Sequence, residues 1–472
     1  TKRLLLNRGD ISVQTGQEYW NNTNPTSTNF TVGGSGDNNA TGQTYVAYLF
    51  ADNSSEDAED QMIKCGSYTG TGAALPINLG WEAQWVLIKK SSGTGGWYLM
   101  DSMRGMPNGG SFNSGHGPTL FADTNAAESL AVAVYPNASG FTINDNGSNI
   151  NASGQTYIYM AVRSEMMVEP SADSATDVFH VNASQGNAGS PSFYSTGFDV
   201  DMAITKRTDA VASHYNGSRL AGSGQFLRTE STNAEDNGGP FLFDVSDGVT
   251  KTGGGGNGND PYVTYMWKRA KGYMDAVAYS GTGSATTVPH SLSVVPEMIW
   301  VKSRDIVFNG TSYTSNWGVY HKDISVSSGM PLNTNENGTA WLSTTFWNDT
   351  APTATVFSLG AGANVTNSTY GTYIAYLFAT LDGISKVGSF VGNGSSQTIS
   401  CGFSAGSRYI LIKRTDAVGD WYVWDSARGI VAGNDPHISL NSNAAQVTND
   451  DSVDPHNSGF IVNQVSATNI NV

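Results

Sequence analysis

The residues best suited to chemistry lie in two copies of one motif, each directly after a tryptophan-rich segment. Asp101-Ser-Met-Arg-Gly105 follows Trp97-Tyr-Leu-Met, and Asp425-Ser-Ala-Arg-Gly429 follows Trp421-Tyr-Val-Trp. A carboxylate and a guanidinium three residues apart can bond sugar hydroxyls while the sugar ring stacks on the neighbouring tryptophan. The predicted ligand-binding residues are therefore Trp97, Asp101, Arg104, Trp421, Asp425 and Arg428.

The same motif also has a structural interpretation, which the sequence leaves open. An aspartate and an arginine at this spacing can pair with each other and fix the turn that leaves the strand. Buried tryptophans with paired Asp and Arg would favour such a clamp, whereas exposed rings beside open carboxylates would favour ligand binding. The motif is also incomplete along the chain, because residues 176–270 show no equivalent and His321 stands where a third aspartate is expected.

Motifs for catalysis and for tight metal binding are missing from the sequence. There is no Glu-x-Asp-x-x-Glu of glucanases, no Gly-x-Ser-x-Gly elbow and no His-Glu-x-x-His zinc motif. Asn144-Asp-Asn-Gly147 and Asn449-Asp-Asp-Ser-Val-Asp454 are oxygen-rich enough to hold Ca²⁺, although turn chemistry explains them equally well. We expect a protein that is not an enzyme and has no resident cofactor, with Ca²⁺ as the one metal that the sequence could accommodate.

Two short signatures recur along the chain with one period of roughly 100 to 115 residues, which indicates a tandem repeat. The first signature is a strand of the type Tyr-Val-Ala-Tyr-Leu-Phe, which closes each repeat, and the second is an apolar strand that ends in lysine. The first tyrosines are Tyr45, Tyr157, Tyr262 and Tyr373, and the lysines are Lys89, Lys206, Lys302 and Lys413. We expect the four tyrosines to occupy matching places in superimposable folds.

Each repeat contains short runs of Val, Ile, Tyr, Phe and Trp that alternate with clusters of Gly, Asn and Ser. About seven such runs per repeat predict antiparallel strands and a domain of β-sandwich size. The predicted fold class is all-β: a tandem array of antiparallel β-sandwich repeats, jelly-roll or concanavalin-like, of about 105 residues each. The strongest helix signal in the chain covers residues 125–134.

The two signatures divide the chain into five segments. They are 1–61, the C-terminal half of a repeat plus an acidic linker; 62–167, repeat 1; 168–270, the divergent repeat 2; 271–381, repeat 3; and 382–472, repeat 4, which lacks its closing strand. That strand could lie further along a longer chain, be disordered, or be donated by another subunit. Linkers are expected at 51–61 and 163–175, whereas the short junctions near 270 and 382 should hold their repeats stiffly.

Composition and charge limit the partners. The formal net charge of −16 with only 14% charged residues disfavours nucleic acid and anionic membranes. Aromatic residues make up 11% of the chain, which excludes a disordered protein. The two cysteines, Cys65 and Cys401, form no disulfide framework and are expected to be buried free thiols.

These sequences resemble repeats in virion structural and tail-fibre-like proteins of marine tailed phages, of the cyanophage type. The resemblance rests on Ala47-Tyr-Leu-Phe-Ala51, Gly66-Ser-Tyr-Thr-Gly-Thr-Gly72, Leu411-Ile-Lys-Arg414 and the Trp-Tyr-x-x-Asp-Ser-x-Arg-Gly segments. It covers nearly the whole chain and is weakest over 176–270. It implies concanavalin-like or jelly-roll sandwiches, a fold that is common in sugar-binding and fibre proteins, and it supplies no catalytic residues.

The expected function is that of a non-enzymatic virion or extracellular protein of the tail-fibre type, which attaches to a host-surface glycan or receptor through many weak contacts. The alternative is a purely structural spacer, capsid decoration or filament subunit, and the least favoured function is a polysaccharide depolymerase. Expected partners are a host glycan and other virion or filament subunits, in a homo-oligomer. Neither nucleic acid nor membrane insertion is expected.

Overall fold

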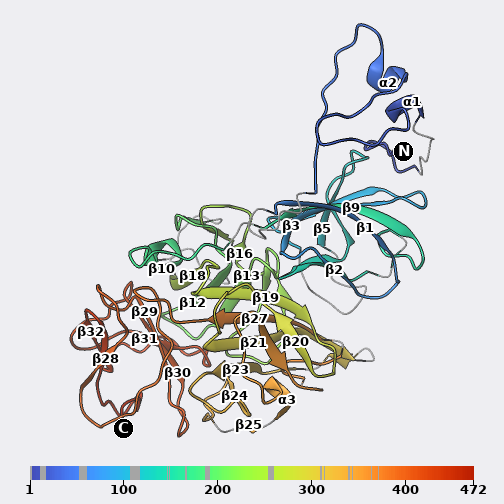
Figure 1. Cartoon of the computed structure of the whole chain (residues 1–472). Coiled ribbons are helices and arrows are strands. Elements are labelled where there is room, and N and C mark those ends of the chain that lie inside the picture. The colour runs from blue at the N-terminus through green and yellow to red at the C-terminus, as the bar shows by residue number, and fades with distance from the viewer. Residues whose placement is uncertain are drawn as a thin grey trace. The chain divides into compact units, whose positions relative to one another are not determined.

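The computed structural model covers the whole chain and confirms the predicted all-β fold class, with antiparallel pairing throughout its sheets (Figure 1). The residues described are 3–10, 17–52, 61–106, 117–145, 147, 149–164, 167–185, 192–252, 260–308, 311–312, 314–338, 341–342, 344–362, 364–369 and 371–472. The chain divides into two compact units. Unit 1 comprises Thr1–Asp101 and His116–Glu165, and unit 2 comprises Ser102–Gly115 and Met166–Val472.

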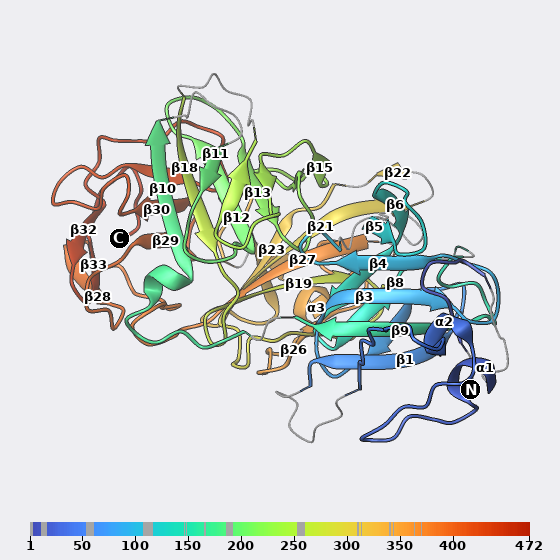
Figure 2. The ribbon, with the colours of Figure 1, turned by 90° about the horizontal axis from the view of Figure 1, so that it is seen from above.

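Unit 1 is a β-sandwich with two short helices before it, α1 (Gln17–Trp20) and α2 (Gly36–Asn39). Its larger sheet has the order β1 (Ile63–Thr69), β9 (Thr156–Arg163), β3 (Ala83–Lys90), β4 (Trp97–Asp101), β5 (Gly117–Phe121), β6 (Ser129–Val132). Its smaller sheet has the order β2 (Leu75–Asn78), β8 (Gly140–Ile143), β7 (Val134–Asn137). Figure 2 shows β1, β9, β3 and β4 side by side.

Unit 2 holds the sheets of predicted repeats 2, 3 and 4. Repeat 2 begins with the 3₁₀ turn Ala175–Asp177, and its larger sheet has the order β10 (Phe179–Gln185), β18 (Pro261–Trp267), β12 (Met202–Arg207), β13 (His214–Ser218). Its second sheet has the order β11 (Ser192–Tyr194), β17 (Val249–Lys251), β16 (Phe241–Leu242). The strands β14 (Gln225–Phe226) and β15 (Asp236–Asn237) form a separate pair. The main sheet of repeat 3 has the order β19 (Met274–Ser280), β27 (Gly371–Phe378), β21 (Met298–Phe308), β23 (Trp317–His321), β24 (Ser328–Pro331), β25 (Trp341–Leu342). The short strand β22 (Thr311–Ser312) also pairs with β21. The strands β20 (Thr286–Pro289) and β26 (Val356–Leu359) form a separate pair, and helix α3 covers Thr344–Trp347. Repeat 4 forms β29 (Tyr409–Lys413), β30 (Trp421–Asp425) and β31 (His437–Ser439) in one sheet and β28 (Gln397–Ser400), β33 (Gly459–Val462) and β32 (Val453–His456) in the other.

The closing strand lies in the middle of its sheet in three of the repeats. β9, β18 and β27 each run between an opening strand and the strand that ends in lysine. In β18 and β27 nearly every residue is buried on both faces, which explains why their sequence is apolar throughout, whereas one face of β9 is only partly buried. The leading tyrosines Tyr157, Tyr262 and Tyr373 are buried at the corresponding registers.

The expectation is wrong for Tyr45. Residues 44–50 belong to no strand, and the side chain of Tyr45 is 47% exposed. A strand needs neighbours to satisfy its backbone groups, and the described residues before Tyr45 include no opening strand and no lysine strand. Val46, Tyr48 and Leu49 are exposed for the same reason.

The three repeats of unit 2 share one hydrophobic core. A single cluster joins Tyr265 of repeat 2, Tyr376 of repeat 3 and Val423 of repeat 4, all essentially buried. Smaller clusters fill the sandwich interior of each repeat, with Phe241 in repeat 2 and Phe460 in repeat 4 as examples. The repeats of unit 2 are therefore packed on one another around a common centre, which agrees with the short junctions near 270 and 382.

Two further expectations are wrong. Residues 125–134 form no helix; they include β6 and the start of β7, and the buried β-branched residues Val132 and Val134 are typical of strands rather than helices. The thiols are not buried either. Cys65 is exposed on the edge strand β1, and Cys401 is only half-buried. Most of the linker at 51–61 lies outside the described residues.

Candidate functional site

The Asp-Ser-x-Arg-Gly motif of repeat 4 forms a closed polar cluster. The Arg428 Nε lies 2.6 Å from the Asp425 Oδ2, and the two side chains are 5% and 0% exposed. Tyr265, from β18 of repeat 2, donates its hydroxyl to the same carboxylate at 2.8 Å and accepts a bond from the Arg428 Nη2 at 3.0 Å. Burial raises the pKa of Tyr265, so its hydroxyl remains a neutral donor. Each of the three side chains therefore bonds the other two, although the buried Arg428 Nη1 has no hydrogen-bond partner.

The tryptophan of this motif is also used inside the protein. Trp421 is 2% exposed, and its indole Nε1 donates to the carbonyl oxygen of Pro331 in repeat 3 at 3.1 Å. Its backbone amide donates to the side chain of Asn441 at 2.8 Å. The ring has no free face on which a sugar could stack. In repeat 4, Asp425 and Arg428 are thus brought together as a clamp, whereas Trp421 is buried at the other end of β30 and bonds other residues.

The lysine signature has a related role, which the sequence did not reveal. Each lysine lies opposite the first residue of the next strand and donates to a backbone carbonyl of a different repeat. The bonds are Lys89 to Gly9 at 3.4 Å, Lys206 to Asn443 at 3.0 Å, Lys302 to Thr232 at 3.3 Å and Lys413 to Asn335 at 3.1 Å. Backbone amides of the hairpins bind the same four oxygens, from Gly95, Ala212, Ser315 and Gly419 respectively. We call these contacts the lysine caps.

The lysine caps of unit 2 form a closed cycle. Repeat 2 caps Lys302 of repeat 3, repeat 3 caps Lys413 of repeat 4, and repeat 4 caps Lys206 of repeat 2. The tryptophans strengthen two of these joints, because Trp317 donates to the carbonyl oxygen of Arg228 at 2.9 Å just as Trp421 donates to that of Pro331. The residues that define the repeat therefore hold each repeat on its neighbour.

Burial disfavours the charged form of these lysines. Desolvation lowers the pKa of Lys302 to about 7, and it lowers the pKa values of Lys206 and Lys413 to about 8. Glu235 partly opposes this effect at Lys302. The neutral and charged forms are thus close in free energy near physiological pH, since a burial penalty disfavours the ammonium form.

The strand β13 fills the place where repeat 2 lacks a recognisable tryptophan strand. His214 pairs with Lys206 at the register at which Trp97, Trp317 and Trp421 pair with their lysines. The sequence did not predict that His214 takes the place of the tryptophan, because neither a histidine nor the following Tyr-Asn-Gly occurs at this position in the other repeats.

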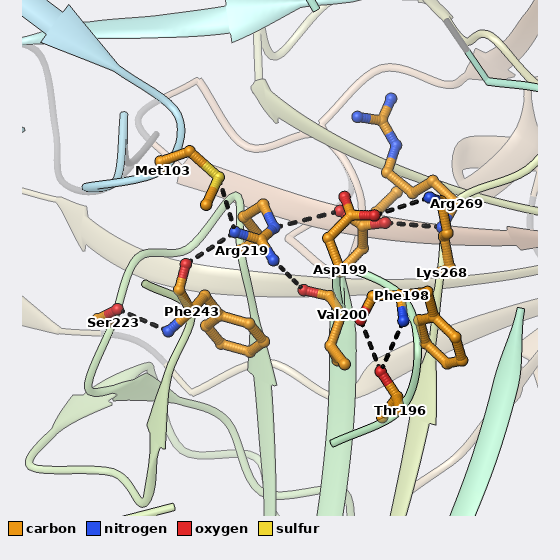
Figure 3. A network of polar contacts seen from close by, with 12 residues as sticks. Met103, Thr196, Phe198, Asp199, Val200, Arg219, Ser223, Phe243, Lys268 and Arg269 are labelled. Atoms are coloured by element: carbon orange, nitrogen blue, oxygen red, sulfur yellow. Dashed lines mark hydrogen bonds and ion pairs between the residues drawn. The ribbon is translucent and has the colours of Figure 1, made fainter. Parts of the chain in front are cut away.

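Repeat 2 also replaces the Asp-Arg clamp with another polar network, shown in Figure 3. Arg219 donates to the carbonyl oxygens of Phe243 at 2.7 Å and Val200 at 2.9 Å, and its Nε lies 3.5 Å from Asp201. The Arg269 amide donates to the same carboxylate at 2.7 Å. Burial raises the pKa of Asp201 to about 6, despite the two neighbouring arginines. The network anchors the end of β13, as the clamp anchors the end of β30.

Repeat 1 differs from repeat 4 in the exposure of its tryptophan. Trp97 also donates its indole Nε1 to a carbonyl oxygen, that of Leu5 at 2.9 Å, but it remains partly exposed. Asp101 ends β4 and Arg104 lies in the segment grouped with unit 2; both are half-buried. Trp97 borders an open pocket of about 460 Å³ on the outer face of the larger sheet. Its lining includes Cys65, Leu87, Ile158, Tyr159 and Met160.

This pocket is one candidate for a binding site in the described part of the chain. Its walls are mainly aliphatic, aromatic or sulfur-bearing, so it suits an apolar partner better than a sugar, which needs several polar groups around it. Of the six sequence-predicted site residues, Trp97 alone lines it.

The two oxygen-rich turns are held by the protein's own donors. Asp145 is buried and accepts bonds from the amides of Ala133 and Gly147, while Asn146 lies outside the described residues. In the second turn, Asp451 and Asp454 both accept from the side-chain amide of Asn463. Among the described residues, no group of three or more His, Cys, Asp or Glu is placed to hold a metal ion. Likewise, none of the described helices is long and apolar enough to span a bilayer.

Comparison with known proteins gives one match. No curated protein and no solved structure matches this chain. A family model described as a domain of unknown function, DUF7483, matches residues 1–165 and 174–471. Because these two segments cover nearly the whole sequence, the chain belongs to the DUF7483 family.

Proposed function

We propose that this protein is a non-enzymatic structural subunit of an extracellular or virion appendage, in which it acts as a spacer or as a decoration. The observation that supports it most is the use of the signature residues in unit 2. Lys302, Trp317 and Trp421 are buried and bond a neighbouring repeat, and Asp425 pairs with Arg428. Residues that could have formed a repeated ligand site instead join repeats into one body.

The arrangement suits a mechanical role. Three sandwiches with a common core and a closed cycle of lysine caps resist separation. Pulling one repeat away would expose apolar surface and would also remove a hydrogen-bond acceptor from a buried lysine. The net charge of −16 keeps such a protein soluble and opposes adsorption to polyanions. The phage-fibre resemblance of the repeats is consistent with this role and suggests the virion as its location.

Host-surface attachment is the second candidate, and one observation favours it. Trp97 is partly exposed beside an open pocket, whereas Trp317 and Trp421 are buried. A glycan or another surface molecule could therefore be bound by unit 1 alone. The apolar lining of the pocket makes this role weaker than the structural one.

Two measurements on the purified full chain test the proposal. Antibodies raised against it should decorate an appendage or filament in immunogold electron micrographs of the native particle or cell surface. A glycan array and a host-cell pulldown should show no specific retention. Retention of one glycan class that a Trp97→Ala variant loses would overturn the structural role in favour of attachment.

A further inference from the structure

The outer face of the larger sheet of unit 1 repeats a residue pattern that is buried elsewhere in the protein. Leu87 stands two residues before its capped lysine, as Ile204, Trp300 and Leu411 stand before theirs. On the closing strand, Met160 corresponds by register to Tyr265 and Tyr376, three residues after the leading tyrosine in each case. The three corresponding faces of unit 2 together form its shared core.

In unit 1 this face is not covered to the same degree. Val86 and Ile88 point into the sandwich and are 0% exposed, whereas Trp85 and Leu87, which alternate with them on β3, remain partly exposed. Ile158 and Met160 on β9 are also partly exposed, and Cys65 on β1 is exposed. The pocket beside Trp97 is the hollow in this face. These side chains form an apolar sheet face that is only partly covered within this chain.

The polar half of a repeat–repeat joint is already complete in unit 1. Lys89 and Trp97 donate to the carbonyl oxygens of Gly9 and Leu5, the same pair of bonds that a neighbouring repeat supplies to Lys413 and Trp421. The interaction that this face still lacks is therefore apolar packing. A partner needs to supply an apolar sheet face and does not need to supply hydrogen-bond donors or acceptors.

We propose that this outer face of unit 1 is an interface between two copies of this chain, each covering the face of the other. Everywhere else in the molecule, a face with this pattern is covered by another face with the same pattern, which favours a like-with-like contact over a foreign partner. Two identical faces can meet around a twofold axis, the commonest symmetry of protein pairs. The inference rests on the structural role proposed above, since it supplies the contact by which subunits associate.

The first test measures the mass of the full chain by sedimentation across a micromolar-to-millimolar concentration series. The wild type should form dimers, and Leu87→Arg and Met160→Arg should each shift it to monomers, because a buried guanidinium in an apolar interface has no partner. Leu130→Arg is the matched control: Leu130 lies on β6 of the same sheet and is 69% exposed, so this variant should dimerise like the wild type. Circular dichroism must show native β structure in all three variants.

A second test needs no charged substitution in the face. In a Cys401→Ser variant, Cys65 is the single thiol and lies in the proposed interface. Its alkylation rate should fall several-fold as the protein concentration rises through the dimerisation range. A monomeric wild type, a dimer that survives both arginine variants, or a concentration-independent alkylation rate would each overturn the interface.

These outcomes are separate from the test of the proposed function. A chain that decorates an appendage in immunogold micrographs yet stays monomeric would keep its structural role and lose the interface. A chain that dimerises through this face but binds a specific glycan would keep the interface and lose the purely structural role.

Discussion

At the scale of single residues, the protein stabilises its repeats with cations that bond carbonyl oxygens rather than carboxylates. Lys302 is 0% exposed, and its Nζ donates hydrogen bonds to the carbonyl oxygens of Thr232 and Ser303. Carbonyl dipoles compensate less of the desolvation of an ammonium group than a full negative charge would, which is why the pKa of Lys302 falls. The caps therefore fix geometry at some cost in stability near neutral pH.

This cost predicts how stability depends on pH. The pKa of Lys302 is about 7 in the fold and ordinarily 10.5, so the unfolded chain binds more protons between these values. The free energy of unfolding should consequently rise from pH 7 to pH 9.5. Lys302 alone should contribute on the order of 3 kcal/mol, and Lys206 and Lys413, whose pKa values are about 8, act in the same direction. Urea unfolding at the two pH values measures it, and a Lys302→Met variant should show a flatter dependence. Below pH 7 the trend is mixed, because burial raises the pKa of Asp435 to about 7. A decline in stability above pH 7 would contradict the interpretation.

The Asp425–Arg428 clamp predicts a large effect of a single substitution. Asp425→Ala leaves the buried Arg428 guanidinium without its carboxylate and should lower the free energy of unfolding by about 3–5 kcal/mol. The Arg414–Asp416 pair offers a matched control, since its Nε–Oδ1 distance of 2.7 Å is similar but the Asp416 side chain is 75% exposed. Asp416→Ala should leave stability nearly unchanged. Equal effects of the two substitutions in denaturant unfolding would rule out the clamp.

At the scale of elements, periodicity and composition were enough to predict the strands but not their contacts. The tyrosine and lysine signatures located β9, β18 and β27 and the strands beside them, because a central strand needs apolar residues on both faces. β13 was missed, since His214 replaces the tryptophan that marks this strand elsewhere. The Trp97 pocket and the lysine caps could not be predicted, because both depend on which segments far apart in sequence lie together.

Two strand pairs illustrate a requirement for glycine that sequence spacing alone does not explain. Gly140 in β8 lies opposite Asn78, and an added Cβ there would be 2.0 Å from the carbonyl oxygen of Ile77. Gly459 in β33 has the same relation to Ile399, at 2.2 Å. The smaller sheets of repeats 1 and 4 can pair so closely because these positions carry no side chain.

Gly140→Ala should therefore force β2 and β8 apart and destabilise unit 1 by about 1–3 kcal/mol. Gly34→Ala is the control, since no atom lies within 4 Å of the Cβ that it would add. Thermal unfolding followed by far-ultraviolet circular dichroism would measure both. If Gly140→Ala were as stable as Gly34→Ala, the close approach of the two strands would be incorrect.

At the scale of the whole molecule, the distribution of cores sets the units of folding. Predicted repeats 2, 3 and 4 share one cluster that includes Trp267, Trp317 and Trp421, whereas repeat 1 belongs to a separate compact unit. Residues in one continuous core unfold together. The molecule should thus behave as two cooperative units although its sequence contains four copies of one pattern.

Calorimetry of the full chain should accordingly show two unfolding transitions. Trp317→Ala removes a fully buried indole from the shared core and should lower the stability of unit 2 by about 3–5 kcal/mol without moving the other transition. Trp97→Ala should do the converse and shift only the transition of unit 1. Four transitions, or a single transition displaced by either variant, would refute this division.

The closed cycle of lysine caps also limits how the sequence can grow. In an open solenoid, one more repeat can be inserted anywhere, because each copy contacts only those before and after it. Here, the insertion of a single repeat would have to break the bond between Lys206 and Asn443 and leave this buried ammonium group with Ala212 as its remaining oxygen partner. We therefore expect these three segments of unit 2 to be gained or lost together, because each one supplies the oxygen partner for a buried lysine of another.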